Sequence, residues 1–178
     1  MAPLNIRLIG DPVLRQRCPE VTEVDGSIAR LAKEMIETLH DAPGIGLAAP
    51  QVGVLKRMFV YDIHDGSGPG VVINPVIAGA TGEWVYEEGC LSIPGLYWEV
   101  TRAKQVHLTG LDLDGNDISI AADELLGRVF LHETDHVDGV LFIDRLDGRT
   151  RKQALRTIRE IQLSGGFPPK VKPDKPEL

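Results

Sequence analysis

The chain has 178 residues, of which 43% are hydrophobic and 25% are charged, and its formal net charge is −7. This length and hydrophobic share suit one compact domain, and no apolar run is long enough to cross a membrane. The two cysteines, Cys18 and Cys90, are too few for a disulfide framework, and residues 1–10 lack the charged and apolar regions of a secretion signal. We therefore expect a cytoplasmic protein with reduced thiols.

The hydrophobic pattern predicts an α+β fold in which a first helix and several strands precede a second helix. Apolar residues recur at helical spacing over residues 27–40, and the following DAPG ends that helix. An Asp-Gly pair within residues 111–120 is typical of a hairpin. Strands are predicted over residues 57–63, 71–77 and 105–111. We expect one compact domain, residues 1–163, with antiparallel or mixed β-sheets packed around a central helix.

Residues 122–139 are predicted to form that central helix, and they contain the motif HETDH. Leucine and valine side chains give the helix an apolar stripe, and Gly139 stands where a C-terminal cap belongs. His132 and His136 lie one turn apart on one face, so both imidazoles can bind the same ion. Glu133 can take a proton from a metal-bound water. The motif therefore predicts a hydrolytic metal site at this helix.

The two histidines need a third ligand to complete such a site. In the pattern HExxHxxGxxH another histidine would follow, but Phe142 stands at that position. The better candidates are Cys90, which lies between glycines and a proline in EEGCLSIPG, and Glu160, which lies in a predicted helix downstream. A cysteine can act as a thiolate ligand in a reducing compartment. The residues alone leave both candidates open.

Three segments of the chain together resemble the peptide deformylase family. They are GIGLAAPQVG at 44–53, EGCLSIPG at 88–95 and HETDH at 132–136. They occur in the order and spacing of that family's motifs, and the resemblance spans residues 1–160. It implies an enzyme that removes the N-formyl group from the initiator methionine of newly synthesised polypeptides and releases formate.

The resemblance also implies a role for individual residues. The implied metal ligands are Cys90, His132 and His136. Glu133 would move the proton. The side-chain amide of Gln51 and the backbone N–H of Leu91 would donate to the oxyanion that forms when water attacks the formyl carbon.

The substrate is expected to bind beside the metal, with its methionine side chain in an apolar pocket. The candidate lining residues are Ile45, Leu126 and Val129. Gly44 and Gly46 lack side chains and would let the substrate backbone lie alongside as an added strand. In GLYWEV, strand alternation would direct only one of the two aromatic side chains toward the substrate, and Tyr97 is our candidate.

One thiolate and two imidazoles suit Zn²⁺ or Fe²⁺. The resemblance favours Fe²⁺ as the native ion, with Zn²⁺, Ni²⁺ or Co²⁺ able to substitute. Glu88 and Arg102 either pair near the cysteine or are surface charges. Asp135 either orients a neighbouring group or is likewise a surface charge.

Positive charge is concentrated late in the chain. Residues 149–178 hold eight basic and three acidic side chains, whereas residues 1–148 hold 11 and 23. Residues 149–163 are predicted to form a basic amphipathic helix, which we expect to dock on ribosomal RNA near the exit tunnel or to be a solvated surface helix. The proline-rich residues 164–178 are expected to be disordered. No membrane or DNA partner is expected.

Two other functions are considered. A metalloendopeptidase with Glu160 as the third ligand would leave GIGLAAPQ and EGCLS without a purpose. A non-catalytic protein that binds ribosomes would be expected to lose the proton shuttle, but Glu133 and Gln51 are both present.

Overall fold

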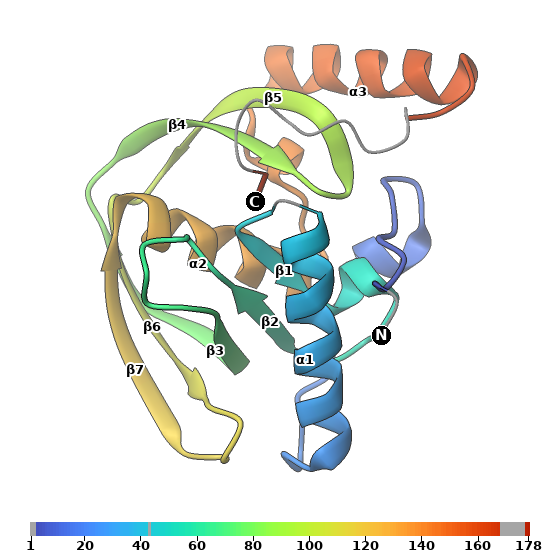
Figure 1. The fold of residues 1–178 in the computed structure, drawn as a ribbon. Coiled ribbons are helices and arrows are strands. Elements are labelled where there is room, and N and C mark those ends of the chain that lie inside the picture. Colours follow the sequence, from blue (N-terminus) through green and yellow to red (C-terminus); the bar gives the residue numbers. More distant parts are fainter. Residues whose placement is uncertain (1–2, 43, 168–176) are drawn as a thin grey trace.

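The computed structural model describes residues 3–42, 44–167 and 177–178, which form an α+β fold (Figure 1). Within these residues there are three α-helices. They are α1 (Gly26–Asp41), α2 (Glu124–Val137) and α3 (Gly148–Leu163). Each lies within two residues of the helix predicted from the hydrophobic pattern. The described helices include none that is long and apolar enough to span a bilayer.

A five-stranded antiparallel sheet with the order β1-β2-β3-β6-β7 forms the body of the fold. Its strands are β1 (Gly46–Ala48), β2 (Met58–Tyr61), β3 (Gly70–Thr81), β6 (Gln105–Leu111) and β7 (Asp117–Asp123). The register between β3 and β6 shifts twice, and bulges of this kind bend a sheet. The sheet curves around α2 in Figure 1. The predicted hairpin is confirmed as the β6–β7 connection, where Asp112 accepts hydrogen bonds from the backbone N–H groups of Asp114 and Asn116.

A second sheet contains only β4 (Trp84–Cys90) and β5 (Ile93–Arg102), which pair antiparallel. A register shift between Glu88 and Cys90 interrupts the ladder just before the turn. Cys90 therefore lies at the end of a strand, in the position that its glycine and proline neighbours suggested. This sheet lies above α2 in Figure 1.

The helix α2 packs against β1, β2, β6 and β7. Its buried side chains include Phe130 and Val137, which share a cluster with Phe59 and Leu108. The apolar stripe predicted for this helix is divided, because Leu126 and Val137 pack in this cluster while Leu125 and Val129 belong to a separate cluster with Ile45. His132 of the same helix contacts Glu88 of β4, so one element contributes to both the core and the site.

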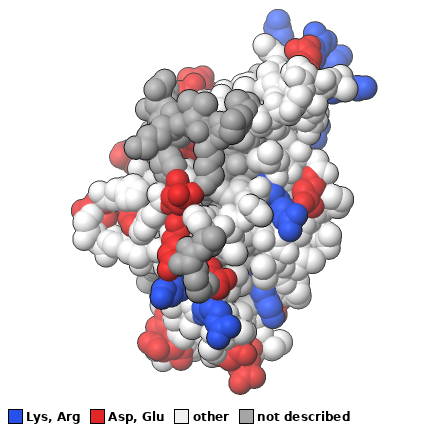
Figure 2. Space-filling model, turned by 45° about the vertical axis from the view of Figure 1, so that its right-hand side comes forward, with Lys and Arg blue, Asp and Glu red and all other residues white. Residues whose placement is uncertain are grey.

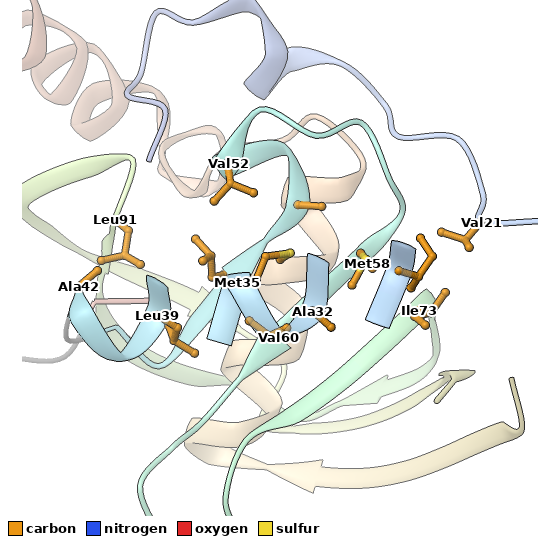
Figure 3. Packing of buried hydrophobic residues seen from close by; sticks show 13 residues of the cluster. Val21, Ala32, Met35, Leu39, Ala42, Val52, Met58, Val60, Ile73 and Leu91 are labelled. Atoms are coloured by element: carbon orange, nitrogen blue, oxygen red, sulfur yellow. The ribbon is translucent and has the colours of Figure 1, made fainter. Parts of the chain in front are cut away.

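The helix α1 covers β1 and β2 with a face built at helical spacing. Ala32, Met35 and Leu39 are fully buried and meet Met58 and Val60 of β2 (Figure 3). The cluster continues to Leu91, beside Cys90, which connects the core under α1 with the segment that follows β4 (Figure 3).

Side-chain caps fix the ends of the helices. Asp25 accepts hydrogen bonds from the first N–H groups of α1, and Asp147 does so for α3. Gly139 follows α2 with φ +76° and donates to the carbonyl of His136, which confirms the predicted cap. A Cβ atom at Gly139 would lie 2.8 Å from the backbone oxygen of Arg15, so the close approach also requires glycine.

The predicted disordered segment, 164–178, has three parts in the structure. Residues 164–167 form a turn and bend after α3, and residues 168–176 lie outside the described part of the chain. Glu177 and Leu178 are 5% and 1% exposed and are hydrogen-bonded to the body of the fold. Burial of these two residues differs from the disorder that the proline-rich composition predicted.

Candidate metal centre

The helix α2 brings His132 and His136 together in a buried position. Both side chains are 1% exposed, their Nε2 atoms are 3.2 Å apart, and their rings meet edge to face. The i, i+4 spacing on a regular helix produces this geometry. Burial, followed by the neighbouring charges of His132 and Arg102, lowers the pKa of His136, so its imidazole stays neutral and keeps a lone pair for a metal.

The turn after β4 places Cys90 against the two histidines. Its Sγ lies 3.3 Å from His136 Nε2, and the ligand atoms of the three residues lie within 4.8 Å of one another. Within the described residues no other group of histidine, cysteine or acidic side chains converges in this way. A thiolate and two imidazoles are a donor set that divalent zinc or iron accepts. Burial raises the pKa of the Cys90 thiol, so metal binding has to displace its proton.

Glu133 lies beside this group with a carboxylate that has no protein partner. It is fully buried, and neither Oε1 nor Oε2 has a hydrogen-bond partner among the described residues. Burial, reinforced by the charge of Glu88, raises its pKa well above the usual value. Gly46 of β1 leaves room for it, because a Cβ atom at that position would lie 2.3 Å from Glu133 Oε1. An unpartnered buried carboxylate next to a metal-binding group is suited to bind a water molecule or ligand.

A buried ionic network orients His132. Glu88 Oε2 lies 3.0 Å from His132 Nδ1, and Arg102 binds Glu88 through two hydrogen bonds of 2.6 and 3.1 Å. Arg102 also donates to Asp135 at 2.7 Å. Burial alone would raise the pKa of Glu88, but the hydrogen bond with His132 and the charge of Arg102 hold it far below its usual range. Glu88 and Arg102 therefore form a buried pair close to Cys90 in sequence and are not surface charges.

Arg128 is a member of this network that sequence reasoning missed. Its side chain is fully buried, and Nη1 donates to Glu88 Oε1 and to the carbonyl oxygen of Val100, both at 2.8 Å. It also lies over the rings of Trp84 and Tyr86. The sequence did contain a hint of this role, because Arg128 lies one helical turn before His132 on a face that is otherwise buried.

Gln51 and Leu91 both reach the metal-binding group. Gln51 belongs to the 3₁₀-helix η2 (Ala49–Val52), and its Oε1 accepts from the backbone N–H of Ala48 at 2.8 Å. This bond directs Nε2 toward Cys90 Sγ, 3.7 Å away, and Ser92 Oγ, 3.2 Å away. The backbone N–H of Leu91 donates to a main-chain oxygen of Leu178 at 3.2 Å, which shows that an oxygen acceptor can reach it.

A small apolar cluster includes Ile45 and Val129, two of the residues predicted to receive the methionine side chain. Ile45, Val129 and Leu178 form a buried cluster that is bordered by Tyr61, Ile63 and Leu125. Leu126, predicted to line the pocket, instead packs against the cluster of Phe130 under the main sheet. Leu125, which lies one turn before Val129, borders the cluster of Ile45 and Val129 instead.

Two of the remaining predicted positions contact Glu177. Gly44 pairs with Glu177 in a parallel bridge, and the Tyr97 hydroxyl lies 3.4 Å from Glu177 Oε1. Trp98 instead stacks near Phe142 in the core, with ring centroids 5.9 Å apart. Strand alternation thus directs Tyr97 toward Glu177 and Trp98 toward Phe142. Glu160 is exposed on α3 and does not belong to the metal-binding group.

Comparison with known proteins identifies the family to which the chain belongs. A model of the family described as polypeptide deformylase matches residues 3–152. The peptide deformylase of Acidothermus cellulolyticus is 48% identical over 165 residues, covering 93% of this chain and 91% of the relative. That of Clostridium botulinum is 52% identical over 145 residues, covering 82% and 97%.

Solved structures agree with these relatives. A crystal structure of a peptide deformylase from Legionella pneumophila superimposes with a TM-score of 0.85 at 39% identity, covering 94% of this chain and 100% of the other. The peptide deformylase from Synechococcus elongatus, solved in complex with actinonin, has a TM-score of 0.83 at 37% identity, covering 97% and 94%. The chain therefore belongs to the polypeptide deformylase family and is a metal-dependent hydrolase that removes the N-formyl group from newly synthesised polypeptides.

Proposed function

We propose that Cys90, His132 and His136 bind one divalent metal ion at which the formyl amide is hydrolysed, with Glu133 as the general base. The observation that supports this most is the convergence of three buried ligand atoms beside a buried carboxylate without a protein partner. Held by these three residues, a divalent ion would supply a water of lowered pKa and polarisation of the amide carbonyl.

Glu133 provides the proton transfer in this proposal. A carboxyl group with a raised pKa can accept a proton from water near neutral pH and then donate it to the departing amine. Its carboxylate is held in place by the closely packed backbone at Gly46. Both oxygens are free of other hydrogen bonds within the described structure, so no competing donor has to be displaced.

Gln51 and Leu91 provide the donors for the developing oxyanion. The side-chain amide of Gln51 is oriented through the N–H of Ala48, and the Leu91 amide belongs to the backbone of the rigid turn after β4. Donors that are fixed before the reaction stabilise negative charge without reorganisation. We assign the methionine side chain of the substrate to the apolar pocket of Ile45 and Val129, and its backbone to the edge formed by Gly44 and Gly46.

For the native ion we propose Fe²⁺, with Zn²⁺, Ni²⁺ or Co²⁺ able to replace it. The thiolate and imidazole donors support an ion of intermediate softness. Metal analysis of protein purified without oxygen tests this assignment. About one iron per chain and a slow loss of activity in air are expected, whereas stoichiometric zinc in active, air-stable protein would contradict it.

Ribosomes are the partner that we propose for α3, in a cytoplasmic setting. Basic side chains gather over α3 at the upper right of Figure 2, on a body of net negative charge. Clustered basic residues support phosphate binding, as on ribosomal RNA. Both described cysteines are unpaired, which suits a reducing compartment.

The proposed reaction is tested with N-formyl-Met-Ala-Ser and its N-acetyl counterpart. Formate should be released from the first peptide, and the acetyl group of the second should remain, because the added methyl group crowds the carbonyl carbon at the metal. Cleavage of an internal peptide bond in either substrate would instead support an endopeptidase and contradict the proposal.

A further inference from the structure

Glu177 and Leu178 occupy the groove beside the metal-binding group. The N–H of Ile45 donates to the carbonyl oxygen of Glu177 at 2.9 Å, and the N–H of Leu91 donates to a main-chain oxygen of Leu178 at 3.2 Å. Glu177 also forms a parallel bridge with Gly44. These two residues therefore add a short extended segment between the entry of β1 and the turn after β4, and Figure 1 shows this end of the chain beside β1 and below β4 and β5.

The side chain of Leu178 fills the apolar pocket. It is 1% exposed and shares its cluster with Ile45 and Val129. Leucine and methionine have similar volumes and are exchanged in cores at small cost. Leu178 thus has the size and chemistry of the side chain that a deformylase pocket receives.

The side chain of Glu177 is hydrogen-bonded to two residues of β5. Its Oε1 accepts hydrogen bonds from the N–H of Gly95 at 2.9 Å and from the hydroxyl of Tyr97 at 3.4 Å. The contacts of the segment are therefore both polar and apolar, and they come from Gly44 and Ile45 just before β1, from β5 and from α2. Contacts on three sides distinguish a bound segment from a chain end lying on the surface.

The same backbone donors cannot serve two peptides at once. The Leu91 N–H is the donor assigned above to the oxyanion, and it is already bonded to Leu178. We propose that Glu177–Leu178 is an intramolecular ligand of the substrate groove, which must leave before an N-formylmethionyl peptide can bind. This inference rests on the proposed location of the substrate. It makes the chain its own competitive inhibitor.

Competition within one chain affects KM but not kcat. When the groove is free in only a fraction of the molecules, the apparent affinity for a substrate falls by that fraction. Leu178→Asp places a charge in the apolar pocket and should release the segment, so KM for N-formyl-Met-Ala-Ser should decrease while kcat is unchanged. A tenfold decrease would correspond to a groove filled in about nine of ten molecules. Leu178→Met should keep the wild-type KM, as should the matched control Leu163→Asp, because Leu163 is 78% exposed on α3.

Hydrogen exchange of the zinc-loaded protein gives a readout that does not depend on catalysis. Peptides that contain the amides of Ile45 and Leu91 should be protected in the wild type and in Leu178→Met and Leu163→Asp, and should exchange faster in Leu178→Asp. Equal exchange in wild type and Leu178→Asp, or an equal KM, would overturn the proposal. A KM that increases with enzyme concentration would also overturn it, since the segment would then bind a second copy. Because the exchange assay needs no turnover, it remains decisive if deformylation itself fails.

Discussion

At the scale of single residues, Glu133 is the group whose removal separates catalysis from metal binding. Its carboxylate is buried, and neither oxygen is hydrogen-bonded to a ligand side chain or to any other group in the described structure. Glu133→Ala should therefore keep about one metal per chain and lose about 10²-fold to 10⁴-fold in kcat. Metal analysis and formate release measure the two properties.

The matched control for this substitution is Glu160→Gln. Glu160 is exposed on α3, so its replacement should change neither metal content nor turnover. Near-normal turnover in Glu133→Ala would exclude Glu133 as the general base. Loss of metal in Glu160→Gln would instead favour the metalloendopeptidase arrangement.

Glu88 positions His132 for metal binding. Glu88→Gln keeps the shape but removes the carboxylate that Arg102 and Arg128 share, which leaves Arg102 with Asp135 alone. We expect metal affinity to fall by about 10-fold to 100-fold, because hydrogen bonds from outside the ligand set orient a ligating histidine. Competition with a fluorescent zinc chelator measures this affinity. An unchanged dissociation constant would show that Glu88 has no part in orienting His132.

The same carboxylate should make stability depend on pH. Its pKa in the fold is below the ordinary 4.5, so the folded state binds fewer protons than the unfolded state in acid. Its contribution to stability is complete above pH 4.5 and is lost as pH falls from there toward the folded pKa. In urea titrations of metal-free protein, the free energy of unfolding should decline less steeply with acid in Glu88→Gln than in wild type. An equally steep decline of the unfolding free energy in the two proteins would show that Glu88 does not cause this pH dependence.

At the scale of elements, the packing of α1 on β2 supports the turn that presents Leu91. Met35 is fully buried in the cluster that extends from α1 to this residue (Figure 3). Met35→Ala should lower the free energy of unfolding by about 2–5 kcal/mol, because less apolar surface is buried and a cavity remains. Leu163→Ala, at a 78% exposed position, should change it by about 0.5 kcal/mol or less. Urea unfolding measures the change in free energy for each variant, provided that the m-values are unchanged. Equal unfolding midpoints for the two variants would show that Met35 contributes no more to stability than an exposed side chain.

The elements differ in how far the sequence alone predicts them. The helix α2 was predictable because its apolar stripe, its histidine pair and the cap at Gly139 agree with one another. The hairpin at Asp112 was predictable from its turn chemistry. By contrast, Leu125 and Leu126 are equivalent in composition, and only the rotation of α2 against β1 decides which of them reaches the pocket. Arg128 was missed for a similar reason, since a buried arginine depends on partners that are distant in sequence.

Burial of Glu177 and Leu178 could not be read from local composition. Proline and lysine around them predict a solvated segment, and the contacts that bury them come from Ile45, Leu91 and Gly95, far away along the chain. Long-range contacts of this kind are not encoded in any local pattern. The general location of the metal site, however, was predictable, because three separate motifs converge on it.

At the scale of the whole molecule, the proposal that α3 binds ribosomes can be tested by reversing the charge of its basic side chains. Lys152, Arg156 and Arg159 are exposed on α3, the helix over which basic side chains gather in Figure 2. Replacing all three with glutamate should weaken co-sedimentation with ribosomes at low salt, and the dependence on log[salt] should become shallower by about 0.7–0.9 for each phosphate that the variant no longer binds. Lys33→Glu, on exposed α1 surface, is the control. Unchanged sedimentation of the triple variant would remove α3 from the interaction.

The central claim is that the chain hydrolyses formyl amides at a metal held by Cys90 and two histidines. Its most direct test compares wild type with Cys90→Ala and Cys18→Ala, all purified without oxygen, for bound metal and for formate release from N-formyl-Met-Ala-Ser. Both cysteines are buried, but only Cys90 belongs to the metal-binding group. We predict that Cys90→Ala loses metal and activity together while Cys18→Ala retains both. Full metal content and turnover in Cys90→Ala, or no formate from metal-loaded wild type, would contradict the account.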